Sequence, residues 1–69
     1  MHMKLMLNGE WVQLEGPLTV QDLLKSRGYR LEMKIAVAIN GHFLPRHAYT
    51  THLIADADDI EVVSPMQGG

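Results

Sequence analysis

The sequence contains no cysteine. A chain without cysteine forms no disulfide, has no thiolate nucleophile, carries no persulfide on its own side chains and offers no thiolate ligand to a metal. Any sulfur chemistry would therefore have to take place on another group. The absence of cysteine also fits a reducing compartment, so we expect a cytoplasmic protein.

Long hydrophobic runs are also absent. The longest apolar stretch, residues 35–39, is far too short to span a bilayer, and Asn8 and Glu10 interrupt any apolar N-terminal signal. The net charge is -2 and no basic residues cluster, which argues against nucleic acid as the main partner. We expect a soluble protein with no membrane and no nucleic-acid partner.

The sequence has 69 residues, which are enough for one domain at most. It contains no recognisable catalytic signature. The sequence has no glycine-rich phosphate-binding loop, no paired catalytic carboxylates and no histidines at metal-binding spacing. Asp56, Asp58 and Asp59 lack the glycine and glutamate of a calcium loop, so we expect a solvated polar turn there. The sequence thus predicts no catalytic residue, no metal site and no bound cofactor, hence a protein that is not an enzyme.

The N-terminal part of the chain predicts a β-hairpin. Apolar residues recur with a period of two over residues 3–7, and a second apolar run covers residues 11–14. Asn8-Gly9 lies between them, and both residues tolerate the positive φ that a tight hairpin turn requires.

A short helix is expected next. Thr19 can cap its N-terminus, and Asp22 three residues later gives a capping-box arrangement. Val20, Leu23 and Leu24 share one helical face. Gly28 suits the end of the helix.

The remaining elements are short strands. The apolar run 35–39 predicts a strand buried on both faces, and Asn40-Gly41 predicts a turn into a return strand at 42–44. Residues 46–55 look irregular or include one helical turn, and residues 60–63 form a last strand. Trp11, Tyr29, Phe43 and Tyr49 complete the core or mark a docking surface, and the sequence does not say which.

This order predicts an α+β fold, a mixed sheet of four to five strands with one main helix, as in a ubiquitin-like β-grasp roll. We assign residues 1–64 to the domain and residues 65–69 to a flexible tail.

The tail ends in Gly68-Gly69. Two glycines offer nothing to pack, but they lack Cβ atoms and can thread a narrow channel in a partner. An α-carboxyl group ordinarily has a pKa of about 3.5, so it is ionised at neutral pH and needs activation before acyl chemistry. Pro65 favours an extended tail. Met66 either anchors in a partner's groove or folds back on its own domain.

These features resemble the ThiS-type sulfur carriers of thiamine biosynthesis over nearly the whole chain. The similarity rests on six segments, namely Leu5 to Gly9, Thr19 to Leu24, Ala36 to Gly41, Leu44-Pro45-Arg46, Asp56 to Ile60 and Gln67-Gly68-Gly69. Asn-Gly followed by Pro-Arg, with the Gly-Gly end at this length, is the most specific part.

The resemblance implies a β-grasp fold and a protein co-substrate. Gly69 would be adenylated by a ThiF-type adenylyltransferase that consumes ATP, and then converted to a thiocarboxylate. Its sulfur would come from a cysteine desulfurase system and pass to a ThiG-type thiazole synthase. Gln67 and Gly68, with Met66, would occupy the partner's channel.

Two departures from the family pattern concern local structure. Ala57 replaces the glycine that usually precedes the last strand, and costs about 1 kcal/mol if the turn needs positive φ. The connector 29–34 matches no segment that we can quote.

Alternatives to this function remain open from the residues alone. A molybdopterin-synthase small subunit also ends in Gly-Gly, although such chains are usually longer. Carriers for other sulfur metabolites and protein-modifying ubiquitin relatives share the same end. A non-catalytic β-grasp interaction module predicts that deleting Gly69 leaves function intact.

Overall fold

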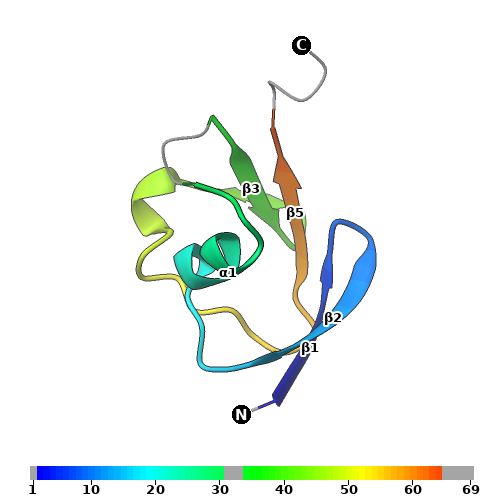
Figure 1. Cartoon of the computed structure of the whole chain (residues 1–69). Helices are drawn as coiled ribbons and strands as arrows, with labels where there is room; N and C mark the ends of the chain where they lie inside the picture. The colour runs from blue at the N-terminus through cyan, green and yellow to red at the C-terminus, as the bar shows by residue number, and fades with distance from the viewer. Residues whose placement is uncertain (1, 31–33, 65–69) are drawn as a thin grey trace.

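The computed structural model describes residues 2–30 and 34–64. In this part of the chain, five strands form one mixed sheet and a single α-helix packs on one of its faces (Figure 1). The predicted α+β class is therefore confirmed. The elements in chain order are β1 (His2–Leu7), β2 (Glu10–Glu15), α1 (Val20–Ser26), β3 (Ala36–Ile39), β4 (His42–Leu44), the 3₁₀-helix η1 (Arg46–Ala48) and β5 (Asp59–Val63).

The strands lie in the order β2-β1-β5-β3-β4. β1 with β2 and β3 with β4 form antiparallel hairpins, whereas β5 runs parallel to β1 and antiparallel to β3. The last of the described strands, β5, thus lies in the middle of the sheet, between the two hairpins.

Both hairpins turn on Asn-Gly, as predicted. Asn8 and Asn40 have φ of 51° and 53°, and Gly9 and Gly41 have φ of 83° and 85°. Both residues of each turn occupy the left-handed region, which is the requirement of a type I′ turn. The residue types at these positions therefore determine where each hairpin reverses.

The predicted capping box at the start of α1 is confirmed. The Asp22 N–H donates to Thr19 Oγ1 at 3.1 Å, and the Thr19 N–H donates to Asp22 Oδ2 at 3.1 Å. The bond from the Thr19 N–H is the main cause that lowers the pKa of Asp22 below its ordinary 3.8. The helix ends at Ser26, and Gly28 follows with φ of 87°.

The segment after η1 covers the start of α1. The Val20 N–H donates to the His52 carbonyl at 3.0 Å, and the Gln21 N–H donates to the Tyr49 carbonyl at 2.9 Å. These N–H groups have no partner within the helix, because the first turn of a helix lacks preceding carbonyls. The irregular segment thus completes the hydrogen bonding of α1 and closes one side of the core.

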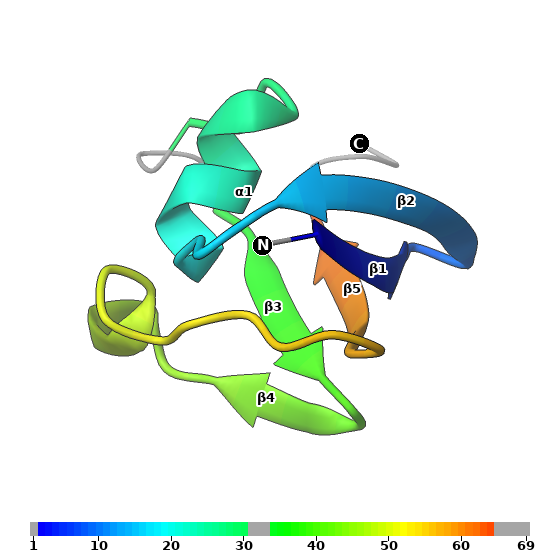
Figure 2. The same cartoon turned by 90° about the horizontal axis from the view of Figure 1, so that it is seen from below.

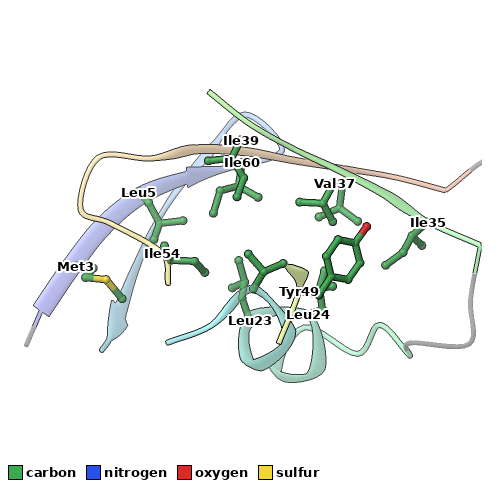
Figure 3. Packing of buried hydrophobic residues seen from close by; sticks show 12 residues of the cluster. Met3, Leu5, Leu23, Leu24, Ile35, Val37, Ile39, Tyr49, Ile54 and Ile60 are labelled. Carbon is green, nitrogen blue, oxygen red and sulfur yellow. The ribbon is translucent and has the colours of Figure 1, made fainter. Parts of the chain in front are cut away.

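The hydrophobic core fills the space between the sheet and α1 (Figure 3). Figure 2 shows the helix on one side of the sheet, and no helix of the described residues lies on the other side. Apolar side chains from β1, β3 and β5 point towards the helix. The buried cluster comprises Met3, Leu5, Val20, Leu23, Leu24, Ile35, Val37, Ile39, Tyr49, Ile54, Ile60 and Val62.

The expectation that the strand at 35–39 is buried on both faces is wrong. Val37 and Ile39 are buried against the helix, whereas Ala36 and Ala38 are half-buried on the opposite face. No helix of the described residues covers that face. The apolar run is continuous because its outward positions are alanines, whose small side chains expose little apolar surface.

No helix among the described residues is long and apolar enough to cross a membrane.

Candidate functional site

The residues predicted to act lie beyond the last described residue, Ser64. Met66, Gln67, Gly68 and Gly69 are outside the described part of the chain, so their assigned roles stay predictions. The structure instead shows the surface around Val63 and Ser64, at the C-terminal end of β5.

β5 is paired on both sides where it begins and on one side where it ends. On one side Asp59 and Ile60 pair with Met6 and Leu7 of β1, and on the other side β3 pairs with Ile60 to Val63. The final β3 pair joins Ala36 to Val63. Strand pairing therefore fixes β5 from both sides at Ile60 and from the β3 side alone at Val63.

The two turn asparagines hold β5 through their side chains. Asn8 Oδ1 accepts the Val62 N–H at 2.8 Å, and Asn40 Oδ1 accepts the Asp59 N–H at 2.9 Å. Each asparagine thus shapes its turn by positive φ and also extends the hydrogen bonding of the central strand. The sequence analysis missed this second role, because the residues of each bond lie far apart in the sequence and no local pattern indicates the contact.

The turn before β5 is anchored by two carboxylates. Asp56 Oδ1 accepts the Lys4 N–H at 2.8 Å, and Asp58 accepts from Asn40 Nδ2 at 3.0 Å and from the Ala55 N–H at 2.9 Å. The expected solvated turn is therefore wrong for Asp58, which is buried. Partners for both of its oxygens offset the cost of burying the carboxylate. These bonds fix the start of β5.

Ala57 lies between these two aspartates with φ of 71°. Its N–H donates to the Lys4 carbonyl at 2.8 Å, so the turn is pinned to β1 in this conformation. The turn therefore does need positive φ, and the strain of about 1 kcal/mol that we expected for Ala57 in that case applies.

The uncovered face of the sheet is partly apolar near the end of β5. Phe43 is 76% exposed and Val63 is 55% exposed. Their strand partners Ala38 and Ala36 lie on the same face, because directly paired residues project to one side of a sheet. Both alanines are half-buried. Glu61, which pairs with Ala38, adds an exposed carboxylate.

The four aromatic side chains divide between core and surface. Tyr49 is buried and Tyr29 packs against the core. Trp11 is exposed, with Lys4 Nζ lying 5.3 Å from the centroid of its ring. Trp11 and Phe43 are therefore the exposed aromatic side chains, which the sequence could not distinguish from the buried pair.

Within residues 2–30 and 34–64 there is no pocket, and no three His, Cys, Asp or Glu side chains are placed to hold a metal ion. The candidate functional site in this part of the chain is therefore the surface around the end of β5.

The profile of the ThiS family matches residues 5–69 of this chain. The chain belongs to the ThiS family. The ThiS match extends through Gly68-Gly69 and covers every segment on which the resemblance was based. The chain is thus a ThiS-type sulfur carrier, and its sheet and helix form the β-grasp fold.

Solved structures agree with this assignment. The crystal structure of the thiamine biosynthesis protein ThiS from Geobacter metallireducens aligns with a TM-score of 0.81 at 30% identity, covering 97% of this chain and 100% of that one. The solution structure of the thiamine biosynthesis protein from the same organism gives a TM-score of 0.78 at 30% identity, with coverage of 97% and 88%.

Two sequence relatives match nearly the whole chain but differ from each other in length. A thiazole synthase of Paramagnetospirillum magneticum is 34% identical over 67 residues, which are 97% of this chain but 20% of that protein. The chain thus spans about a fifth of that relative. The uncharacterized protein ycf40 of Porphyra purpurea is 31% identical over 68 residues, covering 99% of this chain and 94% of that one.

Proposed function

We propose that the carboxyl group of Gly69 carries sulfur as a thiocarboxylate for thiazole formation in thiamine biosynthesis. The observation that carries the proposal is the ThiS-family match, which runs to Gly69 and includes both terminal glycines. In this proposal residues 1–64 are the domain that partners recognise, and residues 65–69 are the reacting tail.

The chemistry proceeds in two transfers. A carboxylate oxygen of Gly69 attacks the α-phosphorus of ATP, pyrophosphate leaves, and an acyl adenylate forms. Sulfur from a donor then attacks the acyl carbon and AMP leaves. When the donor is a persulfide, a thiol must cleave the resulting S–S bond to release the thiocarboxylate.

Partner enzymes supply every catalytic group in this scheme. A ThiF-type adenylyltransferase binds the ATP, and a cysteine desulfurase system provides the sulfur. The carrier acts as a co-substrate, because its own Gly69 carboxyl group is the group that is adenylated and loaded with sulfur. We place these reactions in the cytoplasm.

A ThiG-type thiazole synthase is the proposed acceptor. The relative named thiazole synthase contains a segment that matches 97% of this chain within a longer protein. A carrier segment and a thiazole synthase in one chain support a functional partnership between the two.

A growth test distinguishes this function from its alternatives. In a bacterial strain without its own ThiS-type carrier, the full chain should restore growth without thiamine, and a chain lacking Gly69 should not. Rescue by the chain lacking Gly69 would favour a plain interaction module. In a second strain, which lacks its molybdopterin-synthase small subunit instead, rescue by a chain that fails the thiamine test would assign the chain to that pathway.

A further inference from the structure

The two hairpin turns contain the same dipeptide in the same backbone conformation. Asn8 and Asn40 have φ of 51° and 53°, and the glycines that follow them have φ of 83° and 85°. All four residues are exposed to solvent. A difference in chemistry between the two turns must therefore come from the hydrogen bonds around each asparagine.

An asparagine followed by glycine loses its side-chain amide without an enzyme. The glycine nitrogen gives its proton to hydroxide and forms a bond to the asparagine Cγ, the Cγ–Nδ2 bond breaks, and ammonia leaves with a proton taken from water. Water then opens the resulting succinimide at one of its two carbonyls, which leaves aspartate or isoaspartate. Glycine favours this reaction because it has no Cβ to block the attack and its backbone moves freely.

The attacking nitrogen is available in both turns. Neither the Gly9 N–H nor the Gly41 N–H donates to an acceptor among residues 2–30 and 34–64. The ring closes only when the asparagine Cγ meets this nitrogen, so the side chain must first leave its own hydrogen bonds. The bonds that hold each side chain therefore determine the rate at each site.

The Asn40 side chain is held at both ends of its amide. Its Oδ1 accepts the Asp59 N–H at 2.9 Å, and its Nδ2 donates to Asp58 Oδ1 at 3.0 Å. Asp58 is buried and its other oxygen accepts the Ala55 N–H at 2.9 Å, so this carboxylate is itself fixed. A hydrogen bond to a carboxylate is stronger than one between neutral groups. Deamidation here would also place a second carboxylate against Asp58, and two like charges in contact oppose the change.

The Asn8 side chain is held through its oxygen alone. Its Oδ1 accepts the Val62 N–H at 2.8 Å, and its Nδ2 has no partner within the part of the chain that the structure describes. Ring closure at Asn8 thus breaks one side-chain hydrogen bond, whereas ring closure at Asn40 breaks two.

We propose that Asn8 is a site of spontaneous deamidation, and that Asp58 protects Asn40 from the same reaction. The product bears on the sheet, because Asn8 Oδ1 is the acceptor of the Val62 N–H. Aspartate keeps an oxygen for this bond, whereas isoaspartate lengthens the main chain of the turn by one atom and displaces that oxygen. Isoaspartate at this position therefore releases Val62 from the β1 side of β5.

Mapping of deamidation in the folded, full-length chain tests the proposal. The chain is incubated at mildly alkaline pH in water enriched in heavy oxygen, so that ring opening labels only the product formed during the incubation. Trypsin places the two asparagines in separate peptides, residues 5–25 and 35–46. Labelled product should accumulate at Asn8 at least about tenfold faster than at Asn40.

A matched pair of variants tests the protection of Asn40. Asp58→Asn removes the carboxylate that accepts from Asn40 Nδ2, and it should raise the Asn40 rate by about tenfold. Asp59→Asn removes the same charge one residue away without touching the Asn40 amide, and both rates should stay within about twofold of the unaltered chain. NMR spectra of both variants show whether each remains folded.

Unfolding of the unaltered chain supplies a test that needs no variant. In guanidinium chloride the side-chain bonds of both asparagines are lost, so the two rates should agree within about threefold. This comparison decides the role of the folded contacts even where Asp58→Asn does not fold.

Hydrogen exchange measures the effect of the modification on the sheet. The Val62 N–H should exchange at least about tenfold faster in chains that carry isoaspartate at position 8 than in the unaltered chain. Asn8→Asp is the control, because it retains an oxygen for the bond and should stay within about threefold.

Four results would overturn the proposal. Equal rates at the two sites of the folded chain, or a faster rate at Asn40, would contradict the difference between the turns. Absence of product at Asn8, while the unfolded chain deamidates, would show that the fold protects both sites. An Asn40 rate that a folded Asp58→Asn variant leaves unchanged would refute the role of Asp58.

Discussion

At the scale of single residues, Ala57 has a conformation that suits glycine better. Its φ of 71° brings Cβ close to the following carbonyl, which costs an L-residue about 1 kcal/mol. The bond from its N–H to the Lys4 carbonyl and the contacts of Asp56 and Asp58 on either side hold it there. The surrounding hydrogen bonds thus fix the turn despite the residue that occupies it.

Ala57→Gly should therefore stabilise the protein. Relief of the left-handed strain exceeds the extra freedom that glycine gives the unfolded chain, and we expect a net gain of about 0.5 kcal/mol. Urea unfolding of the variant measures this gain. Ala55→Gly is the control, because Ala55 has no positive φ and the change should destabilise. An Ala57→Gly variant less stable than the unaltered chain would contradict this account.

At the scale of elements, α1 is short and depends on its N-terminal hydrogen bonds. It contains 7 residues, too few for a helix to persist alone in water. Thr19 and Asp22 exchange two bonds in the capping box, and the loop carbonyls of Tyr49 and His52 accept two more N–H groups. Packing of Val20, Leu23 and Leu24 into the core then holds the helix on the sheet.

Thr19→Ala should destabilise the fold by about 1 kcal/mol, because the Asp22 N–H loses its acceptor at the helix start. Thermal or urea unfolding measures the loss. Thr50→Ala is the matched control, since Thr50 is exposed and its change should stay within about 0.5 kcal/mol. Equal effects of the two substitutions would show that the capping box contributes nothing.

Asp22 should make stability depend on pH in the acid range. Its pKa is lowered in the folded state, chiefly by the bond from the Thr19 N–H, so its contribution exists above the ordinary value of 3.8. That contribution is lost as pH falls below 3.8 through the folded-state pKa. The unaltered protein should therefore be more stable than Asp22→Asn at about pH 7, and the two should converge towards about pH 2. A difference that is constant with pH would refute this assignment.

Local signals in the sequence predicted the elements well where a residue type determines the backbone. Asn-Gly at two positions and the Thr19–Asp22 pair encode their own conformations, and the structure confirms both. The strand at 35–39 was wrongly expected to be buried on both faces, because hydrophobicity alone does not reveal which face a helix covers. The burial of Tyr49 and the exposure of Phe43 depend likewise on tertiary contacts that no short segment contains.

At the scale of the whole molecule, the topology places β5, which ends one residue before the last described residue, in the middle of the sheet. β5 joins two hairpins that are distant in sequence, and parallel pairing with β1 brings residues near the C-terminus beside residues 6 and 7. This long-range pairing could be inferred only through the family resemblance. The roles of Met66, Gln67, Gly68 and Gly69 stay predictions, because they depend on a partner that the chain itself does not contain.

The central claim is that Gly69 accepts sulfur, and intact-mass spectrometry tests it most directly. The full chain is incubated with ATP, a ThiF-type adenylyltransferase and a sulfur source, beside a reaction without ATP and a chain that lacks Gly69. The account predicts that one oxygen is replaced by sulfur, that fragmentation locates the change at Gly69, and that both controls stay unmodified. An unchanged mass, with the enzyme shown to be active on another ThiS protein, would contradict it.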